Sequence, residues 1–144
     1  MELIIGNNAD IIAKSQAIRH KVFVIEQGIP LELDLDGLDE NCCHALVTVG
    51  DLPIATARLF TADGKHAIMA RVAVAQEYRH SGIATKVVKA LITHAAETNV
   101  VSIEIHAHEY LREYYERFGF EFVQEVEIVG GHQLIEMHYP LKRL

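Results

Sequence analysis

Apolar positions follow two different spacings along the 144-residue chain, and each spacing predicts one kind of element. Short apolar runs bounded by turn residues predict strands, the last two joined at Gly130-Gly131 as a hairpin. These strand predictions cover residues 3–5, 45–49, 54–60, 67–74, 100–105, 120–128 and 134–141. Apolar residues three and four positions apart predict helices over 9–25, 84–95 and 110–118. The order of these elements predicts a single α/β domain with a mixed sheet.

The net charge of −7 is concentrated in one segment of the chain. No lysine or arginine occurs between Val22 and Ala57, whereas acidic residues recur there: Glu26, Glu32, Asp34, Asp36, Asp39, Glu40 and Asp51. A face that binds nucleic acid would carry the opposite sign, so we expect no nucleic-acid partner. The acidic segment favours a cationic guest, or else it is a solvated loop or irregular helix over residues 32–41.

Composition is that of an ordinary soluble domain, with 50% hydrophobic and 23% charged residues. No apolar run approaches the length of a membrane span, and the N-terminus lacks the basic region of a signal peptide, so we expect no membrane partner. Cys42 and Cys43 are adjacent, which places their Cα atoms about 3.8 Å apart, below the usual disulfide range. Free thiols, and therefore a cytoplasmic location, are predicted.

The turn Arg79-His80-Ser81-Gly82-Ile83-Ala84 is the most informative motif because of its flanks. It follows the apolar run 68–74 and precedes the predicted helix 84–95. A strand that leads through a glycine-containing turn into a helix presents unpaired backbone N–H groups, which suit a phosphate group. The same short pattern also occurs in plain strand-to-helix turns, so the flanking elements decide in favour of an anion site.

Three segments of the chain together resemble the GNAT superfamily of N-acetyltransferases. Residues 72–84 resemble its coenzyme A pyrophosphate loop, and residues 108–120 resemble a later helix motif with an aromatic-Tyr pair before Gly-Phe. Residues 19–27, with Asp36, Asp39 and His44, resemble the ElaA/YjcF-like branch. The resemblance implies one GNAT domain over residues 1–144. Its sheet would be mixed and mostly antiparallel, with about six to seven strands flanked by helices and splayed at the middle strands.

The resemblance implies acetyl-CoA as the donor. Backbone N–H groups from His80 to Thr85 would hold the pyrophosphate at the helix dipole. The strand before the turn would pair with the pantetheine amides, and an N–H near Val74 would polarise the thioester carbonyl. The implied cofactor-binding residues are Val72, Ala73, Val74, Arg79, His80, Ser81, Gly82, Ile83, Ala84 and Thr85.

By family position, Tyr115 is the predicted general acid that protonates the leaving thiolate. Ile68 stands where the family often carries a glutamate base, so we expect Glu26, or water, to take the proton from the amine. The predicted acceptor-binding residues are Asp36, Asp39, His44 and Arg71. Arg58 and Arg71 lie in apolar strands and are predicted to join a buried ionic network with Glu26 or the aspartates, the alternative being an acidic part of the acceptor.

His106 and His108 alternate on one strand face, which permits metal ligation. The sequence reveals no third ligand at a suitable spacing, and family position makes His108 a helix-start residue, so no metal is predicted. His132 lies two places early relative to Met137 in the branch's closing pattern, which leaves an acceptor-site role for it open.

The leading hypothesis is an acetyl-CoA-dependent N-acetyltransferase that uses direct attack by a primary amine in a ternary complex. The acceptor is a small molecule or a peptide that the sequence does not identify. One alternative is a non-catalytic acyl-CoA-binding or regulatory module, which the missing strand glutamate favours. Another is an acyltransferase that uses a longer acyl-CoA. The oligomeric state, a homodimer included, is left open.

Overall fold

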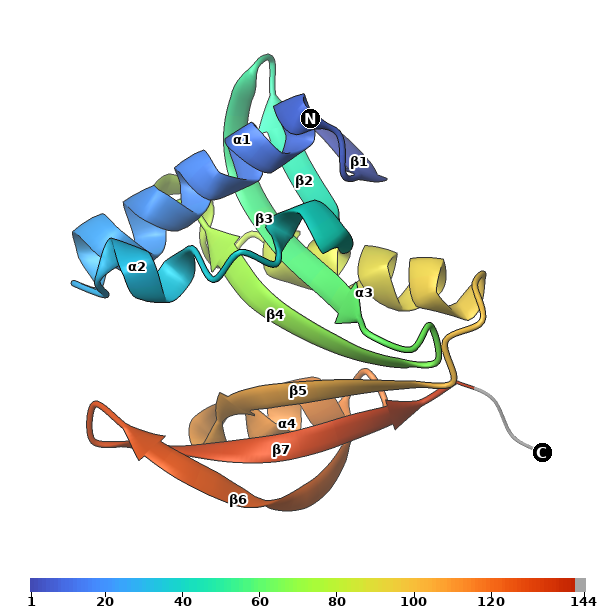
Figure 1. The fold of residues 1–144 in the computed structure, drawn as a ribbon. Helices are drawn as coiled ribbons and strands as arrows, with labels where there is room; N and C mark the ends of the chain where they lie inside the picture. Colours follow the sequence, from blue (N-terminus) through green and yellow to red (C-terminus); the bar gives the residue numbers. More distant parts are fainter. Residues whose placement is uncertain (142–144) are drawn as a thin grey trace. The chain divides into compact units, whose positions relative to one another are not determined.

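The computed structural model describes residues 1–141, whose strands form one seven-stranded sheet in the order β1-β2-β3-β4-β5-β7-β6. The strands are β1 Glu2–Gly6, β2 Cys42–Val49, β3 Leu52–Thr61, β4 His66–Val74, β5 Ser102–His108, β6 Glu121–Val129 and β7 His132–Pro140 (Figure 1). The pairs β1–β2, β2–β3, β5–β7 and β6–β7 are antiparallel, and β4–β5 is parallel. The predicted mixed, mostly antiparallel sheet is therefore confirmed, as is the closing hairpin.

The helical elements are α1 Ala9–Arg19, η1 His20–Glu26, α2 Leu31–Asp34, η2 Asp39–Asn41, η3 Gln76–Tyr78, α3 Ile83–Ala96, η4 Glu109–Leu111 and α4 Arg112–Glu116. The predicted helix 9–25 has the expected extent, and the Asn8 side chain caps it by accepting from the Ile11 N–H at 2.9 Å. Its winding changes at His20 from α to π, a form common at functional sites. None of the helices within residues 1–141 is long and apolar enough to cross a bilayer.

Two sequence predictions of element boundaries are wrong. The strand predicted over 100–105 runs instead from Ser102 to His108. His108 is also the N-cap of the 3₁₀ turn η4, so its predicted position at a helix start is confirmed. The helix predicted over 110–118 is a 3₁₀ turn followed by the short helix α4, because the chain turns back at Gly119 with a φ of 115°. That left-handed φ favours glycine, and it lets the Phe120 N–H reach the Tyr115 carbonyl at 3.2 Å.

The chain divides into two compact units, each made of two separate stretches. The first contains Met1–Phe60 and Arg71–Thr93, and the second contains Thr61–Ala70 and the chain from His94 onward. In the first unit, Ile18 and Val22 pack against Ala73 and Ala75, with Phe23 and Tyr78 at the edge of this cluster. The helix α1–η1 is therefore packed directly on the end of β4, beside the predicted phosphate turn.

In the second unit, the ladder register decides which side chains are buried. Ile105 faces Met137 and Ala107 faces Ile135 across β5 and β7, and all four are buried. Helix α4 lies along one face of these strands, where the Tyr115 and Phe120 rings contact each other at a centroid distance of 5.7 Å (Figure 1). The alternate residues of both strands lie on the opposite face.

Truncation of Ile135 tests this core assignment. Ile135 is 0% exposed and Ile128, in the same hairpin, is 68% exposed. We expect Ile135→Ala to lower the free energy of unfolding by about 2–5 kcal/mol through the lost burial and the cavity left behind, and Ile128→Ala by under about 0.5 kcal/mol. Urea denaturation of both variants measures this, and equal losses would contradict the assignment.

Candidate functional site

The predicted phosphate turn has the backbone geometry of an anion site. His80 and Gly82 adopt left-handed φ angles of 65° and 82°, and helix α3 begins at the next residue, Ile83. The first backbone bond of the helix joins the Lys86 N–H to the Gly82 carbonyl at 3.2 Å. A turn of this kind directs successive N–H groups toward one concave side, and the helix dipole adds positive potential there. A Cβ atom at Gly82 would meet nothing within 4 Å, so the space beside the turn is open.

Arg79 is held by protein groups on both sides. Its Nε donates to the Val74 carbonyl at 2.9 Å, and its Nη2 donates to Glu26 Oε2 at 2.8 Å. The structure thus joins a predicted cofactor residue to the predicted base through one ion pair. The Arg79 side chain is 34% exposed and the Glu26 side chain is 26% exposed.

The strand that leads to this turn is kinked at Arg71. Its φ of 59° is left-handed, which is a strained conformation for a residue with a side chain and costs about 1 kcal/mol or more. The guanidinium compensates by donating from Nε to Asp34 Oδ1 at 3.1 Å and from Nη2 to Asp36 Oδ2 at 3.3 Å. Beyond the kink, the Ala75 N–H donates to the Ile54 carbonyl at 2.8 Å. The backbone of residues 72–74 is thus fixed at both ends.

Asp34 and Asp36, the partners of Arg71, belong to a buried network of arginines and aspartates. Arg19 is 0% exposed, and it donates from Nε to Asp34 Oδ1 at 3.1 Å and from Nη1 to Asp39 Oδ1 at 2.7 Å. Arg58 donates to the same Asp39 oxygen at 3.0 Å and also forms an ion pair with Asp36. The predicted ionic network of Arg58 and Arg71 is present, and its acidic members are the aspartates.

These contacts bear directly on the predicted acceptor residues. Hydrogen bonds and the charges of Arg19 and Arg58 hold the pKa of the Asp39 carboxyl below its ordinary value despite burial, and Arg58 lowers the pKa of Asp36. The second Asp39 oxygen accepts from Gln16 at 2.9 Å. Asp39 is thus ionised and fully engaged inside the protein, whereas the Asp36 side chain keeps 30% of its surface exposed.

His44 is also enclosed. It is 0% exposed, its Nε2 lies 2.8 Å from the Asp39 carbonyl oxygen, and burial lowers the pKa of its imidazole. Its Nδ1 is buried with no hydrogen-bond partner. The imidazole is therefore neutral, and its contact with the Asp39 carbonyl supports the loop that contains Asp36 and Asp39.

Tyr115 lies in the second unit, on α4. It is 8% exposed and its ring contacts those of Tyr114, Phe118 and Phe120 at 5.1, 6.1 and 5.7 Å. Burial raises the pKa of the phenol to about 12, so it keeps its proton at neutral pH. A protonated phenol is a donor and not a base.

Four polar side chains, two from each strand, lie on one face of β5 and β7, and their spacing along the chain did not predict that they would meet. Glu104 and His106 on β5 lie beside Glu136 and His138 on β7, because the register pairs Glu104 with His138 and His106 with Glu136. The signal in the sequence is the Glu-x-His spacing, which occurs in both strands. At the end of β5, the ring of His108 lies 5.1 Å from that of His132, and burial lowers the pKa of His108.

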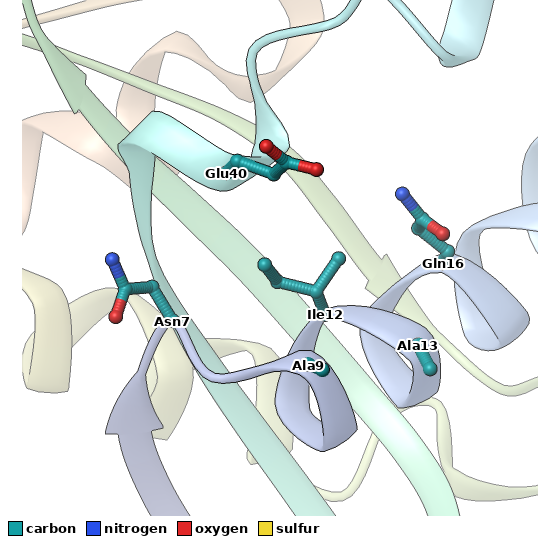
Figure 2. A pocket seen from close by; sticks show the side chains of 6 residues that line it. All are labelled: Asn7, Ala9, Ile12, Ala13, Gln16 and Glu40. Atoms are coloured by element: carbon teal, nitrogen blue, oxygen red, sulfur yellow. The ribbon is translucent and has the colours of Figure 1, made fainter.

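A hollow of about 330 Å³ opens beside the start of α1. Figure 2 shows its lining of Asn7, Ala9, Ile12, Ala13, Gln16 and Glu40. Glu40 is its sole ionisable lining group, and Gln16 is already bonded to Asp39. Among the lining residues, Glu40 has no second ionisable or nucleophilic group beside it, so the hollow offers no pair of groups for acid–base or nucleophilic chemistry.

The chain is similar to known proteins over most of its length. Residues 15–120 match the sequence model of the acetyltransferase (GNAT) family. The uncharacterized N-acetyltransferase YjcF of Bacillus subtilis is 26% identical over 131 residues, which cover 91% of this chain and 93% of YjcF. A crystal structure from Lactobacillus plantarum assigned as an N-acetyltransferase is 27% identical, with a TM-score of 0.86 and 98% of both chains covered.

Escherichia coli ElaA has the same fold, with a TM-score of 0.83 at 22% identity, covering 96% of this chain and 98% of ElaA. Together with the sequence match to YjcF, this likeness confirms the resemblance to the ElaA/YjcF-like branch.

Substitution of Arg19 tests the importance of the buried network. We expect Arg19→Met to lower the free energy of unfolding by about 3–5 kcal/mol, because Asp34 and Asp39 lose a buried cation. Lys14→Met is the control in the same helix, since it removes an i,i+4 pair with Asp10 and should cost under about 1 kcal/mol. Urea denaturation at pH 7 measures both.

Urea denaturation of the wild type and Arg19→Met at several pH values tests the same network. The folded-state pKa values of Asp36 and Asp39 lie below the ordinary 3.8, so their contribution is complete above that pH and is lost as the pH falls below it. Wild-type stability should therefore fall below about pH 4. That fall should be shallower in Arg19→Met, and an identical acid slope in both proteins would contradict the assignment.

Proposed function

Because the chain belongs to the acetyltransferase (GNAT) family, we propose that it moves the acetyl group of acetyl-CoA to a primary amine by direct attack in a ternary complex. Acyl transfer to an amine is the activity of the family, and the family uses acetyl-CoA. The acceptor class that we propose, a small molecule or a peptide amine, goes beyond the family assignment. The observation that carries the donor proposal is the open left-handed turn at His80–Gly82 ahead of α3.

The turn would bind the pyrophosphate of CoA mainly through backbone N–H groups of residues 80–85. His80 and Gly82 supply the left-handed geometry, and Ile83 starts the helix while its side chain is buried in the core. Because Arg79 already bonds Val74 and Glu26, its charge would assist the phosphate from behind the turn. The pantetheine would pair with the backbone of residues 72–74.

In the proposed reaction, the neutral amine attacks the thioester carbonyl carbon, and the N–H near Val74 stabilises the oxyanion. The intermediate collapses with cleavage of the carbon–sulfur bond, and the thiolate takes the proton of Tyr115. Before the attack, the acceptor ammonium loses one proton to Glu26 or to water. Since Glu26 accepts a hydrogen bond from Arg79 on Oε2, the carboxylate would take this proton on Oε1. After the attack, the positively charged nitrogen of the intermediate loses a second proton, which returns through water to the Tyr115 phenolate.

On the acceptor side, Asp36 would contact a cationic amine, because it is the most exposed carboxylate of the aspartate network. Asp39 and His44 would act beneath it by fixing the loop, and Arg71 would hold Asp36 in place. This division of roles follows from burial: Asp39 and His44 are both buried, whereas the Arg71 side chain is 26% exposed.

A non-catalytic acyl-CoA-binding module is the second candidate. It is favoured because Ile68 stands where the family often carries a glutamate base, and because Glu26 is paired with Arg79. An acyltransferase that uses a longer acyl donor is the third candidate, and a comparison of acetyl-CoA and octanoyl-CoA binding separates it from the first.

The cytoplasm is the proposed location, supported by the free thiols of Cys42 and Cys43. A homodimer is compatible with all three candidates.

Substitutions of glycine test the donor site. We expect Gly82→Asp to weaken acetyl-CoA binding by about tenfold or more, through crowding and repulsion of the pyrophosphate, and Arg79→Ala to weaken it less. Gly130→Asp is the matched control, since Gly130 has a φ of 57° and equally open surroundings in the β6–β7 turn. Isothermal titration with acetyl-CoA measures all three, and equal, negligible effects of Gly82→Asp and Arg79→Ala would contradict the site.

Turnover tests the reaction itself. We expect release of free CoA thiol with at least one member of a panel of primary amines and peptides, and Tyr115→Phe should lower kcat by about 10²-fold with acetyl-CoA affinity unchanged. Tyr110→Phe, at a 72% exposed position, is the control. Tight acetyl-CoA binding without acceptor-dependent thiol release would support the non-catalytic module instead.

A further inference from the structure

Four side chains that could bind a metal gather on one face of the second unit. Antiparallel pairing places Glu104 beside His138 and His106 beside Glu136, so the four form a compact square over β5 and β7. The buried residues of the same strands, such as Ile105 and Met137, point to the other face. The β5–β7 pairing therefore fixes the backbone positions of all four residues on one face of the sheet.

The hydrogen bonds within this square already bring the polar atoms together. His106 Nε2 lies 2.8 Å from Glu104 Oε2, and His138 Nε2 lies 2.6 Å from Glu136 Oε2 and 3.6 Å from Glu104 Oε1. One ligand atom each of Glu104, His106 and Glu136 lies within 4.8 Å of the other two. Each imidazole presents Nε2 to the square.

The charge balance of the square differs from that of the aspartate network. Asp34, Asp36 and Asp39 have arginine partners. Glu104 and Glu136 form ion pairs only with histidines among the described residues. With neutral imidazoles, the square carries two negative charges that no lysine or arginine of the described chain neutralises by an ion pair.

We propose that Glu104, His106 and Glu136, with His138 as a fourth ligand, form a binding site for one Zn²⁺ ion. Two carboxylate oxygens and two imidazole nitrogens are a donor set that zinc accepts in tetrahedral geometry. The ion would take the place of the Nε2 protons that now bridge the square, and each imidazole would bind it through Nε2 as the neutral tautomer whose single proton is on Nδ1. Two positive charges would balance the two carboxylates.

The required movement is small. Ligand atoms about 2.1 Å from a common tetrahedral ion are about 3.4 Å from one another. The separations of up to 4.8 Å among Glu104, His106 and Glu136 therefore close by about 1.5 Å or less. The contacts of 2.8 and 2.6 Å open by less than about 1 Å, and side-chain rotation provides both changes. The Glu136 position is also supported from outside the square, since Gln124 Nε2 donates to Glu136 Oε1 at 3.0 Å. This site goes beyond the proposed acetyl transfer and does not depend on it.

Zinc titration of tag-free, chelator-treated protein tests the site directly. Calorimetry should give one Zn²⁺ per chain, and saturating Mg²⁺ should not compete, because magnesium prefers oxygen ligands and octahedral geometry. His106→Asn and Glu104→Gln should each weaken binding by more than about tenfold. Co²⁺ in place of Zn²⁺ should give the visible absorption of a tetrahedral site in the wild type and lose it in His106→Asn.

Matched controls use the same residue types elsewhere on the surface. His20→Asn and Glu125→Gln, both at exposed positions, should leave zinc affinity unchanged. NMR of the histidine side chains adds a readout that needs no variant to fold: Zn²⁺ should shift the imidazole signals of His106 and His138 and leave those of His20 in place. No zinc binding, or equal binding by wild type and His106→Asn, would overturn the proposal.

Discussion

The first unit depends on the buried ion pairs between Arg19, Arg58, Arg71 and the aspartates of the 34–39 segment. Burial of its leucines contributes little to holding that segment, because Leu35 is 41% exposed and Leu38 is only half-buried. The segment is held by charge, through a guanidinium group that is 0% exposed on α1. A buried arginine is costly unless it is paired, so the ion pairs couple helix α1, the acidic segment and strand β3 to one another.

The network extends to strand β4 through Arg71. Its left-handed φ of 59° divides β4, and the aspartates hold the side chain of the strained residue. After this kink the strand continues to Val74, whose carbonyl accepts from Arg79 at the beginning of the phosphate turn. Ion pairs that are distant from the turn in sequence therefore fix the backbone that leads into it. Strain of this kind is typical of functional sites, where surrounding contacts maintain it.

Much of the fold follows from apolar spacing. Buried strands such as β2 and β3 are mostly apolar. The turn at residues 79–84 has its expected flanks because a strand, a glycine and an amphipathic helix are local signals. The π winding of η1 could not be predicted in this way, because it changes hydrogen-bond partners without changing the apolar pattern.

Partner choice and strand register were the other limits. The pattern of charges indicated a network, yet only the fold shows that Glu26 pairs with Arg79 and that Arg58 pairs with the aspartates. Likewise His106 has no third ligand by spacing along the chain, because Glu136 comes from a strand whose register is set by tertiary packing. Contacts between residues distant in sequence thus account for most of what the sequence left open.

A crystal structure of the chain with acetyl-CoA bound is the most direct measurement of the central claim, that the turn before α3 binds the donor through its backbone. The account predicts pyrophosphate oxygens within hydrogen-bond distance of N–H groups between His80 and Thr85, beside the open space at Gly82. A pyrophosphate bound away from this turn, or held by side chains alone while the turn amides contact nothing, would contradict it.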